Sequence, residues 1–149
     1  MSIPQSRRSQ AHLALNTYVK QMRAANAARN FASRSLGDAG VTLTQFAVLE
    51  ALYHLGPMSL SDIAQKVLTT GGNLTMVLGN LEKQGLAKRH PCPEDRRMMI
   101  VVLTAKGKLL IRKVFPQHAA AIAGFLDVLS PEERARLGEL CRKLGKQEM

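Results

Sequence analysis

The sequence predicts a mainly helical protein with one small β-hairpin (α+β), and two observations carry that prediction. Apolar residues recur at helical spacing along most of the 149 residues, as amphipathic helices require. The one β-branched apolar run, residues 98–103, follows a Pro-rich turn at 91–95, and this order is typical of a hairpin. Because a chain of this length buries one good core, we expect a single domain over residues 1–149.

The first predicted helix spans about residues 11–36 and ends before Gly37. A second begins at Thr42, where Gln45 completes a capping box, and ends at Gly56-Pro57. A short third helix follows Ser59. The fourth runs from Thr70 or Asn73 to Gln84 and ends at Gly85, which we expect in the left-handed conformation.

Two further helices follow the hairpin. Thr104 caps the first, which reaches about residue 129, and Pro116 within it should kink or break it near Phe115. Ser130-Pro131 is a strong start for the last helix. Over about residues 42–103, two short helices followed by a basic hairpin predict a winged helix-turn-helix.

Charge favours a polyanionic partner, because 21 Lys and Arg against 11 Asp and Glu give a formal net charge of +10. With no Trp, two Tyr and four Phe, a stacking platform for single strands is disfavoured, so we expect double-stranded DNA. No apolar run approaches the roughly 18 residues that span a bilayer. We therefore expect no membrane partner and a cytoplasmic location, which two cysteines also fit.

The fourth helix has a non-core stripe without any acid: Asn73, Met76, Asn80 and Lys83. Asn can bond base edges, Lys can neutralise phosphate and Met can contact a thymine methyl. A solvated face is the alternative, but the cations of the hairpin favour DNA. The predicted DNA-binding residues are Ser59, Ser61, Thr70, Asn73, Thr75, Met76, Asn80, Lys83, Lys88, Arg89, Asp95, Arg96 and Arg97.

Three runs, residues 74–89, Pro93-Glu-Asp-Arg-Arg97 and Val102-Leu-Thr-Ala-Lys-Gly107, resemble the multiple-antibiotic-resistance regulator (MarR) family. The resemblance covers about residues 11–125. It implies a homodimer in which dimerisation helices at about 11–36 and 104–146 interlock, and each lobe reads half of a pseudopalindromic operator. It also implies that Asp95 and Arg97 are the acid and arginine of the wing, with Arg96 placed for the minor groove.

The resemblance further implies a small organic effector, often a phenolic or aromatic acid, bound between the dimerisation helices and the DNA-binding lobe. Its pocket would draw on Tyr18, Met22, Phe46, Leu49 and Tyr53, although each could instead be plain core. Gly79 departs from the family, whose members commonly carry Asp there to pair with a wing arginine. How Arg97 is paired therefore stays open.

The sequence does not support a catalytic function, because it lacks a metal-binding helix motif, a Walker loop, a nucleophile elbow and a dinucleotide-binding motif. We expect no enzyme. The four histidines, His12, His54, His90 and His118, are scattered, so we predict no metal site and no cofactor.

We predict a repressor that a small ligand releases from DNA, with two alternatives. In a redox sensor, cations of the wing would favour a reactive thiolate at Cys92, although Cys92 could be an incidental turn residue and Cys141 a packing residue. In a non-specific architectural protein, charge alone would supply the affinity for DNA.

Overall fold

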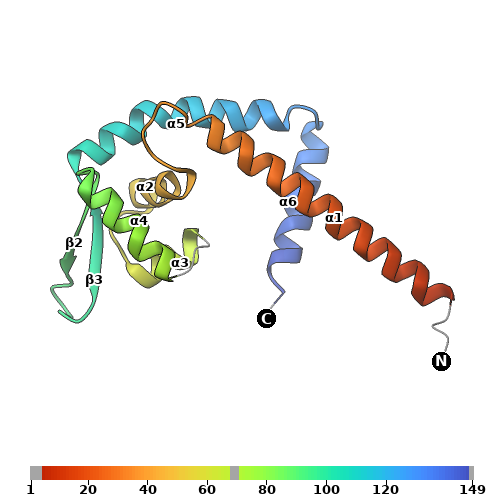
Figure 1. Ribbon diagram of the computed structural model, residues 1–149, viewed down its shortest axis with the longest axis horizontal. Helices are drawn as coiled ribbons and strands as arrows, with labels where there is room; N and C mark the ends of the chain where they lie inside the picture. Colours follow the sequence, from red (N-terminus) through yellow and green to blue (C-terminus); the bar gives the residue numbers. More distant parts are fainter. Residues whose placement is uncertain (1–4, 68–70, 148–149) are drawn as a thin grey trace. The chain divides into compact units, whose positions relative to one another are not determined.

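The computed structural model describes residues 5–67 and 71–147 and has the predicted mainly helical architecture (Figure 1). Thr70, a predicted DNA contact, lies outside the described residues. The helices are α1 (Gln5–Arg34), α2 (Leu43–Leu55), α3 (Leu60–Val67), α4 (Gly71–Lys83), α5 (Ala105–Leu126) and α6 (Pro131–Gly145). Strands β1 (Met58–Ser59), β2 (Ala87–Pro91) and β3 (Met99–Leu103) form an antiparallel sheet in the order β1-β3-β2.

The chain divides into two compact units. Ser33–Ala119 forms one, which we call the winged-helix unit, and the two ends of the chain, up to Ala32 and from Ala120, form the other, the helical unit. The division falls inside α1 and α5, so that each of these helices contributes to both units.

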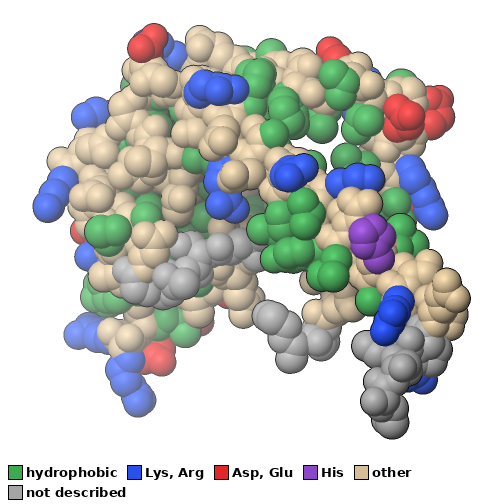
Figure 2. All heavy atoms as spheres, turned by 45° about the vertical axis from the view of Figure 1, so that its right-hand side comes forward, with side chains coloured by type: hydrophobic (Ala, Val, Ile, Leu, Met, Phe, Trp, Pro, Cys, Tyr) green, Lys and Arg blue, Asp and Glu red, His purple; other side chains and the backbone are tan. Residues whose placement is uncertain are grey.

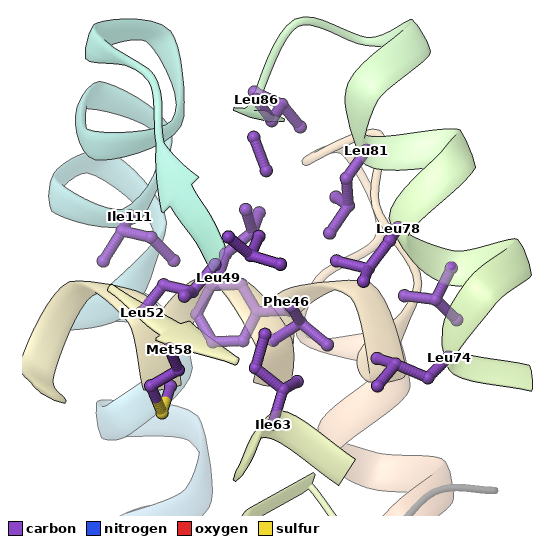
Figure 3. Close-up of a cluster of buried hydrophobic side chains, with 14 of the residues drawn as sticks. Phe46, Leu49, Leu52, Met58, Ile63, Leu74, Leu78, Leu81, Leu86 and Ile111 are labelled. Atoms are coloured by element: carbon purple, nitrogen blue, oxygen red, sulfur yellow. The ribbon is translucent and has the colours of Figure 1, made fainter. Parts of the chain in front are cut away.

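The hydrophobic core of the winged-helix unit gathers around α2. Phe46 of α2 points toward Ile63 of α3 and the buried leucines of α4, whereas Leu52 of α2 lies on the side of Ile111 (Figure 3). Ile111 closes the cluster from α5. Since full burial of one such side chain contributes about 1.5–3 kcal/mol, this core fixes how α4 is presented.

The predicted helix ends are confirmed where local chemistry sets them. The Thr42 side chain accepts a hydrogen bond from the Gln45 amide at 3.2 Å, and the Gln45 side chain accepts one from the Thr42 amide at 3.0 Å. Ser130 and Glu133 form the same reciprocal pair. Gly85 has φ 71°, and the Leu86 amide donates to the Leu81 carbonyl at 2.9 Å, as a left-handed cap predicts.

Three features differ from the prediction. Helix α1 is already present at Gln5, the first described residue, because residues 5–10 are polar but compatible with a helix. The two-residue strand β1 pairs Met58 with Val101 and was not predicted. Helix α5 continues through Pro116 instead of breaking there. Pro116 is exposed, so water can satisfy the carbonyl that loses its amide donor.

The helical unit contains α6, most of α1 and the end of α5. The rings of Phe31 and Phe125 pack together with centroids 5.1 Å apart, yet α6 buries none of its residues. Large apolar side chains of α1 and α6 are exposed, and hydrophobic side chains show on the surface in Figure 2. Within the described residues, no helix has both the length and the apolar character needed to cross a membrane.

Candidate nucleic-acid interface

Helix α4 has one buried and one exposed face. Leu74, Val77, Leu78 and Leu81 are buried in the core. The five predicted DNA contacts of this helix are all exposed: Asn73, Thr75, Met76, Asn80 and Lys83. Met76 leaves 62% of its surface exposed, so its side chain is accessible for contact with a thymine methyl.

Helix α3 precedes α4 and begins at a serine cap. Ser59 is buried, and its hydroxyl accepts a hydrogen bond from the Asp62 amide at 3.2 Å. The same hydroxyl is hydrogen-bonded to that of Ser61 at 3.2 Å. Ser61 is exposed, so of these two predicted contacts it is the one whose side chain faces solvent.

Strands β2 and β3 form the wing, in a register that pairs Lys88 with Val102 and Arg89 with Val101. At its tip the Cys92 amide donates to the Met98 carbonyl at 2.7 Å. Asp95 then organises the turn, because its side chain accepts from the Arg97 amide at 3.1 Å. The Asp95 carbonyl accepts from the Met98 amide at 2.9 Å.

An ion pair ties the wing to α4. Arg89 Nε lies 2.6 Å from Glu82 Oε1, and each side chain is about one-third exposed. Arg97 remains in the wing, with Nε 3.6 Å from Asp95 Oδ1 and a side chain 95% exposed. With Gly79 in place of an acid, the wing is therefore linked to α4 through Arg89 and Glu82.

Sequence reasoning missed Glu82 as part of this site. The available signal was that Glu82 is the only acid in α4 and precedes a basic strand across the tight turn at Gly85. The pairing also offsets the charge of the one acid of this helix, which would otherwise repel DNA phosphates.

The turn after α4 is fastened to the start of α5. The Thr104 hydroxyl donates to the Gly85 carbonyl at 2.6 Å, and Lys106 Nζ donates to the Gln84 carbonyl at 2.8 Å. A Cβ on Gly107 would overlap the Leu86 carbonyl oxygen, so only glycine permits this close approach. These contacts hold β3 and α4 in a fixed relation.

The resulting surface is cationic. Lys83, Lys88, Arg96 and Arg97 are exposed, and Lys and Arg side chains extend from the lower left of the space-filling view, where the wing lies (Figure 2). Clustered cations repel one another unless a polyanion lies between them. A helix with Asn, Met and Lys on its exposed face beside such a wing is equipped for DNA.

The five predicted effector residues occupy different settings. Phe46 and Leu49 are fully buried in the core, at 1% and 0% exposure, so a ligand would reach them only after the core had moved. Tyr53 is half-buried beside Arg112, whose Nε donates to the Tyr53 hydroxyl at 3.3 Å. Tyr18 and Met22 are exposed on α1 and line one surface groove together with Arg23 and Arg29.

Both cysteines are free thiols. Cys92 is half-buried in the wing, whereas Cys141 is exposed on α6. Among the described residues, no three His, Cys, Asp or Glu side chains converge as metal ligands would.

Comparison with known proteins agrees with this geometry. The model of the MarR family matches residues 41–99. The HTH-type transcriptional regulator MhqR of Bacillus subtilis is 35% identical over 131 residues, which cover 88% of this chain and 90% of MhqR.

Two solved structures share the fold. Sco3205, a MarR family regulator from Streptomyces coelicolor in complex with DNA, is 27% identical with a TM-score of 0.81, over 93% of this chain and 87% of its own. BpsR of Bordetella bronchiseptica, described with a mechanism for regulation of its DNA binding by 6-hydroxynicotinic acid, is 26% identical with a TM-score of 0.81, over 86% and 91%. This chain belongs to the MarR family of DNA-binding, winged-helix transcription regulators.

Proposed function

We propose that this regulator is a homodimeric repressor that binds a pseudopalindromic operator and is released by a small aromatic acid. The observation that carries the proposal is the exposed face of α4, which bears Asn73, Met76 and Asn80 and whose neighbouring acid is neutralised by Arg89. Amide side chains in a major groove discriminate between bases. Specific recognition is therefore favoured over binding by charge alone.

The homodimer is supported by the helical unit. Leu15, Tyr18 and Met22 of α1 are 50–66% exposed, and Leu137, Leu140 and Leu144 of α6 are 43–47% exposed. Apolar side chains repeated at helical spacing on two helices form a surface that is normally covered. A second copy covers it with the same residues, as a two-fold interface requires.

An effector pocket is supported within the winged-helix unit. A cavity of about 580 Å³ lies between the residues that follow α1 and the middle of α5. Leu36, Leu110 and Val114 supply apolar walls, while the polar groups include the cations Arg34 and Lys113, the acid Asp38 and Gln117. This volume and this mixture suit a small aromatic acid, the chemical class to which the BpsR ligand 6-hydroxynicotinic acid belongs.

Release of the dimer from DNA would follow from a change in the spacing of its two recognition helices. Dimeric readers hold their recognition helices about 34–36 Å apart, one turn of DNA. A ligand that binds better to a dimer with another spacing shifts the population away from the DNA-competent form. Such a ligand lowers operator affinity without touching the DNA-binding residues.

The test is binding of the purified protein to a duplex from its own upstream region and to a scrambled duplex, at two salt concentrations. Each titration is repeated with 6-hydroxynicotinic acid and related aromatic acids. We expect preference for the upstream duplex, and its loss with at least one acid. If the protein binds both duplexes equally, and only salt weakens this binding, the protein is instead a non-specific architectural DNA-binding protein.

A further inference from the structure

The turn between α4 and β2 is held by the first residues of α5 and the threonine before them (Figure 1). Lys106 Nζ donates a hydrogen bond to the Gln84 carbonyl at 2.8 Å. The Thr104 hydroxyl donates to the Gly85 carbonyl at 2.6 Å, and the Thr104 amide donates to the Leu86 carbonyl at 3.1 Å. Three consecutive carbonyl groups are therefore bonded from one helix end, and we call these three hydrogen bonds the clasp.

The clasp acts where the helix with the predicted base contacts passes into the wing. Helix α4 ends at Lys83 and strand β2 begins at Ala87, so the three bonded carbonyls make up the whole connection between them. A connection this short transmits any displacement to the elements on both of its sides. The clasp therefore holds α4 and the wing to α5 at a single place.

The carbonyl groups of this turn need donors from another element. The amides of the turn donate back to carbonyls in the last turn of α4, so they satisfy the end of the helix and not the turn itself. The left-handed conformation of Gly85, with φ 71°, directs the chain away from the helix axis. The start of α5 supplies the donors that the turn does not contain.

Lys106 is the residue of the clasp whose side chain has no second role in capping α5. The Thr104 hydroxyl also accepts a hydrogen bond from the Gly107 amide at 3.1 Å and so caps that helix. Lys106 is exposed, and its Cδ lies 3.9 Å from the position that a Cβ on Gly85 would occupy. Its side chain therefore runs along the turn and places the ammonium group at the C-terminal end of α4, where the helix dipole attracts a cation.

We propose that Lys106 is a positioning residue for sequence discrimination, which holds α4 and the wing in their reading orientation through the Gln84 carbonyl and does not contact DNA. Hydrogen bonds to base edges weaken steeply when the angle between donor and acceptor changes. Attraction between cations and phosphates tolerates small displacements. Loss of this hydrogen bond therefore reduces preference for the operator more than affinity for any duplex. The inference rests on the operator binding proposed above.

The test measures binding of Lys106→Met and Lys108→Met to the upstream and the scrambled duplex by fluorescence anisotropy, over a series of salt concentrations. Lys108 is the matched control, because it is an exposed cation two residues along the same helix whose side chain is not part of the clasp. We expect the two variants to bind the scrambled duplex equally and with the same salt slope. Only Lys106→Met should lose affinity for the upstream duplex, by about two- to tenfold, the range that one hydrogen bond usually carries.

Lys106→Arg should keep the preference of the parent, because a guanidinium group can still donate to the Gln84 carbonyl. The proposal is overturned if Lys106→Met discriminates between the duplexes as Lys108→Met does. It is also overturned if Lys106→Met weakens binding to both duplexes alike and lowers the salt slope by about one, since Lys106 would then contact a phosphate directly. A parent protein without any preference would contradict the proposed operator binding as well, whereas the other two outcomes leave operator binding intact.

Discussion

The ion pair between Arg89 and Glu82 connects the wing to α4, a connection that Gly79 cannot make because it has no side chain. Because both side chains are about one-third exposed, the pair contributes modestly to stability, within the 0–1 kcal/mol usual for surface pairs. Its larger effect is on charge, since it holds Arg89 against α4 and neutralises the only acid of that helix.

Glu82→Gln should separate these two roles. We expect the free energy of unfolding to fall by less than about 1 kcal/mol. Affinity for a scrambled duplex should rise, because the variant removes a negative charge beside the DNA surface and frees Arg89. Urea denaturation measures the first effect and fluorescence anisotropy the second. A scrambled-duplex affinity equal to that of the parent would contradict the charge argument.

Substitutions of Arg96 and of Asn73 should change DNA binding in different ways. Arg96, exposed at the tip of the wing, is expected to contact the DNA backbone or minor groove. Arg96→Ala should therefore weaken binding to every duplex and reduce the salt slope by about one. Asn73→Ala should cost about 1–3 kcal/mol at particular bases and relax preference there. Anisotropy titrations over a set of single-base operator variants would distinguish them, and two variants with parent-like binding would contradict both assignments.

Gly79 and Gly107 are both helical glycines, but only one is required by its surroundings. A Cβ on Gly79 would meet nothing within 4 Å, so Gly79→Ala should stabilise the protein by about 1 kcal/mol. Gly107→Ala should destabilise it, because the new methyl overlaps the Leu86 carbonyl oxygen. Thermal and urea unfolding of the two variants compare them directly. Destabilisation by Gly79→Ala would show that α4 needs glycine there.

At the scale of elements, the sequence was most informative where a helix end depends on neighbouring residues. Thr42 with Gln45, Ser130 with Glu133, and Gly85 each act within a few residues of the chain. Such signals do not depend on how the rest of the fold packs. The core face of α4 was predictable for the same reason, from a spacing that only a helix satisfies.

Strand β1 and the continuity of α5 depend instead on partners far along the chain. Two residues, Met58 and Ser59, carry no strand pattern of their own and become a strand only by pairing with β3. Proline usually interrupts a helix, and Pro116 was expected to do so. Here the packing of Ile111 and Val114 in the core and the ring contact of Phe115 with His54 hold the helix around it.

Helix α6 buries none of its residues, and this exposure leads to a prediction about the dimer. Leu140→Asp should prevent burial of the α1 and α6 surface, and the molar mass in solution should fall from twice 16.3 kDa to 16.3 kDa. Met98→Asp, which alters an exposed apolar residue of the wing, should leave the mass unchanged. Light scattering after gel filtration measures both. A parent protein of 16.3 kDa would contradict the homodimer.

For the whole molecule, net charge and helical pattern were enough to predict a winged helix for duplex DNA. The exposed residues of α4 and the cations of the wing lie where the sequence placed them. The sequence did not reveal that Ser59 is a buried cap, that Asp95 orders the wing tip, or that Arg112 and Tyr53 meet across 59 positions. These contacts join elements whose relative placement local patterns do not determine.

The central claim is that two copies of this winged helix read one stretch of DNA, and footprinting of the upstream region tests it most directly. We expect two protected major-groove windows, centred about 10 base pairs or a multiple of that apart. Both should be lost together as salt rises or in Arg96→Ala. Uniform protection along the duplex, or a single window that one copy fills, would contradict it.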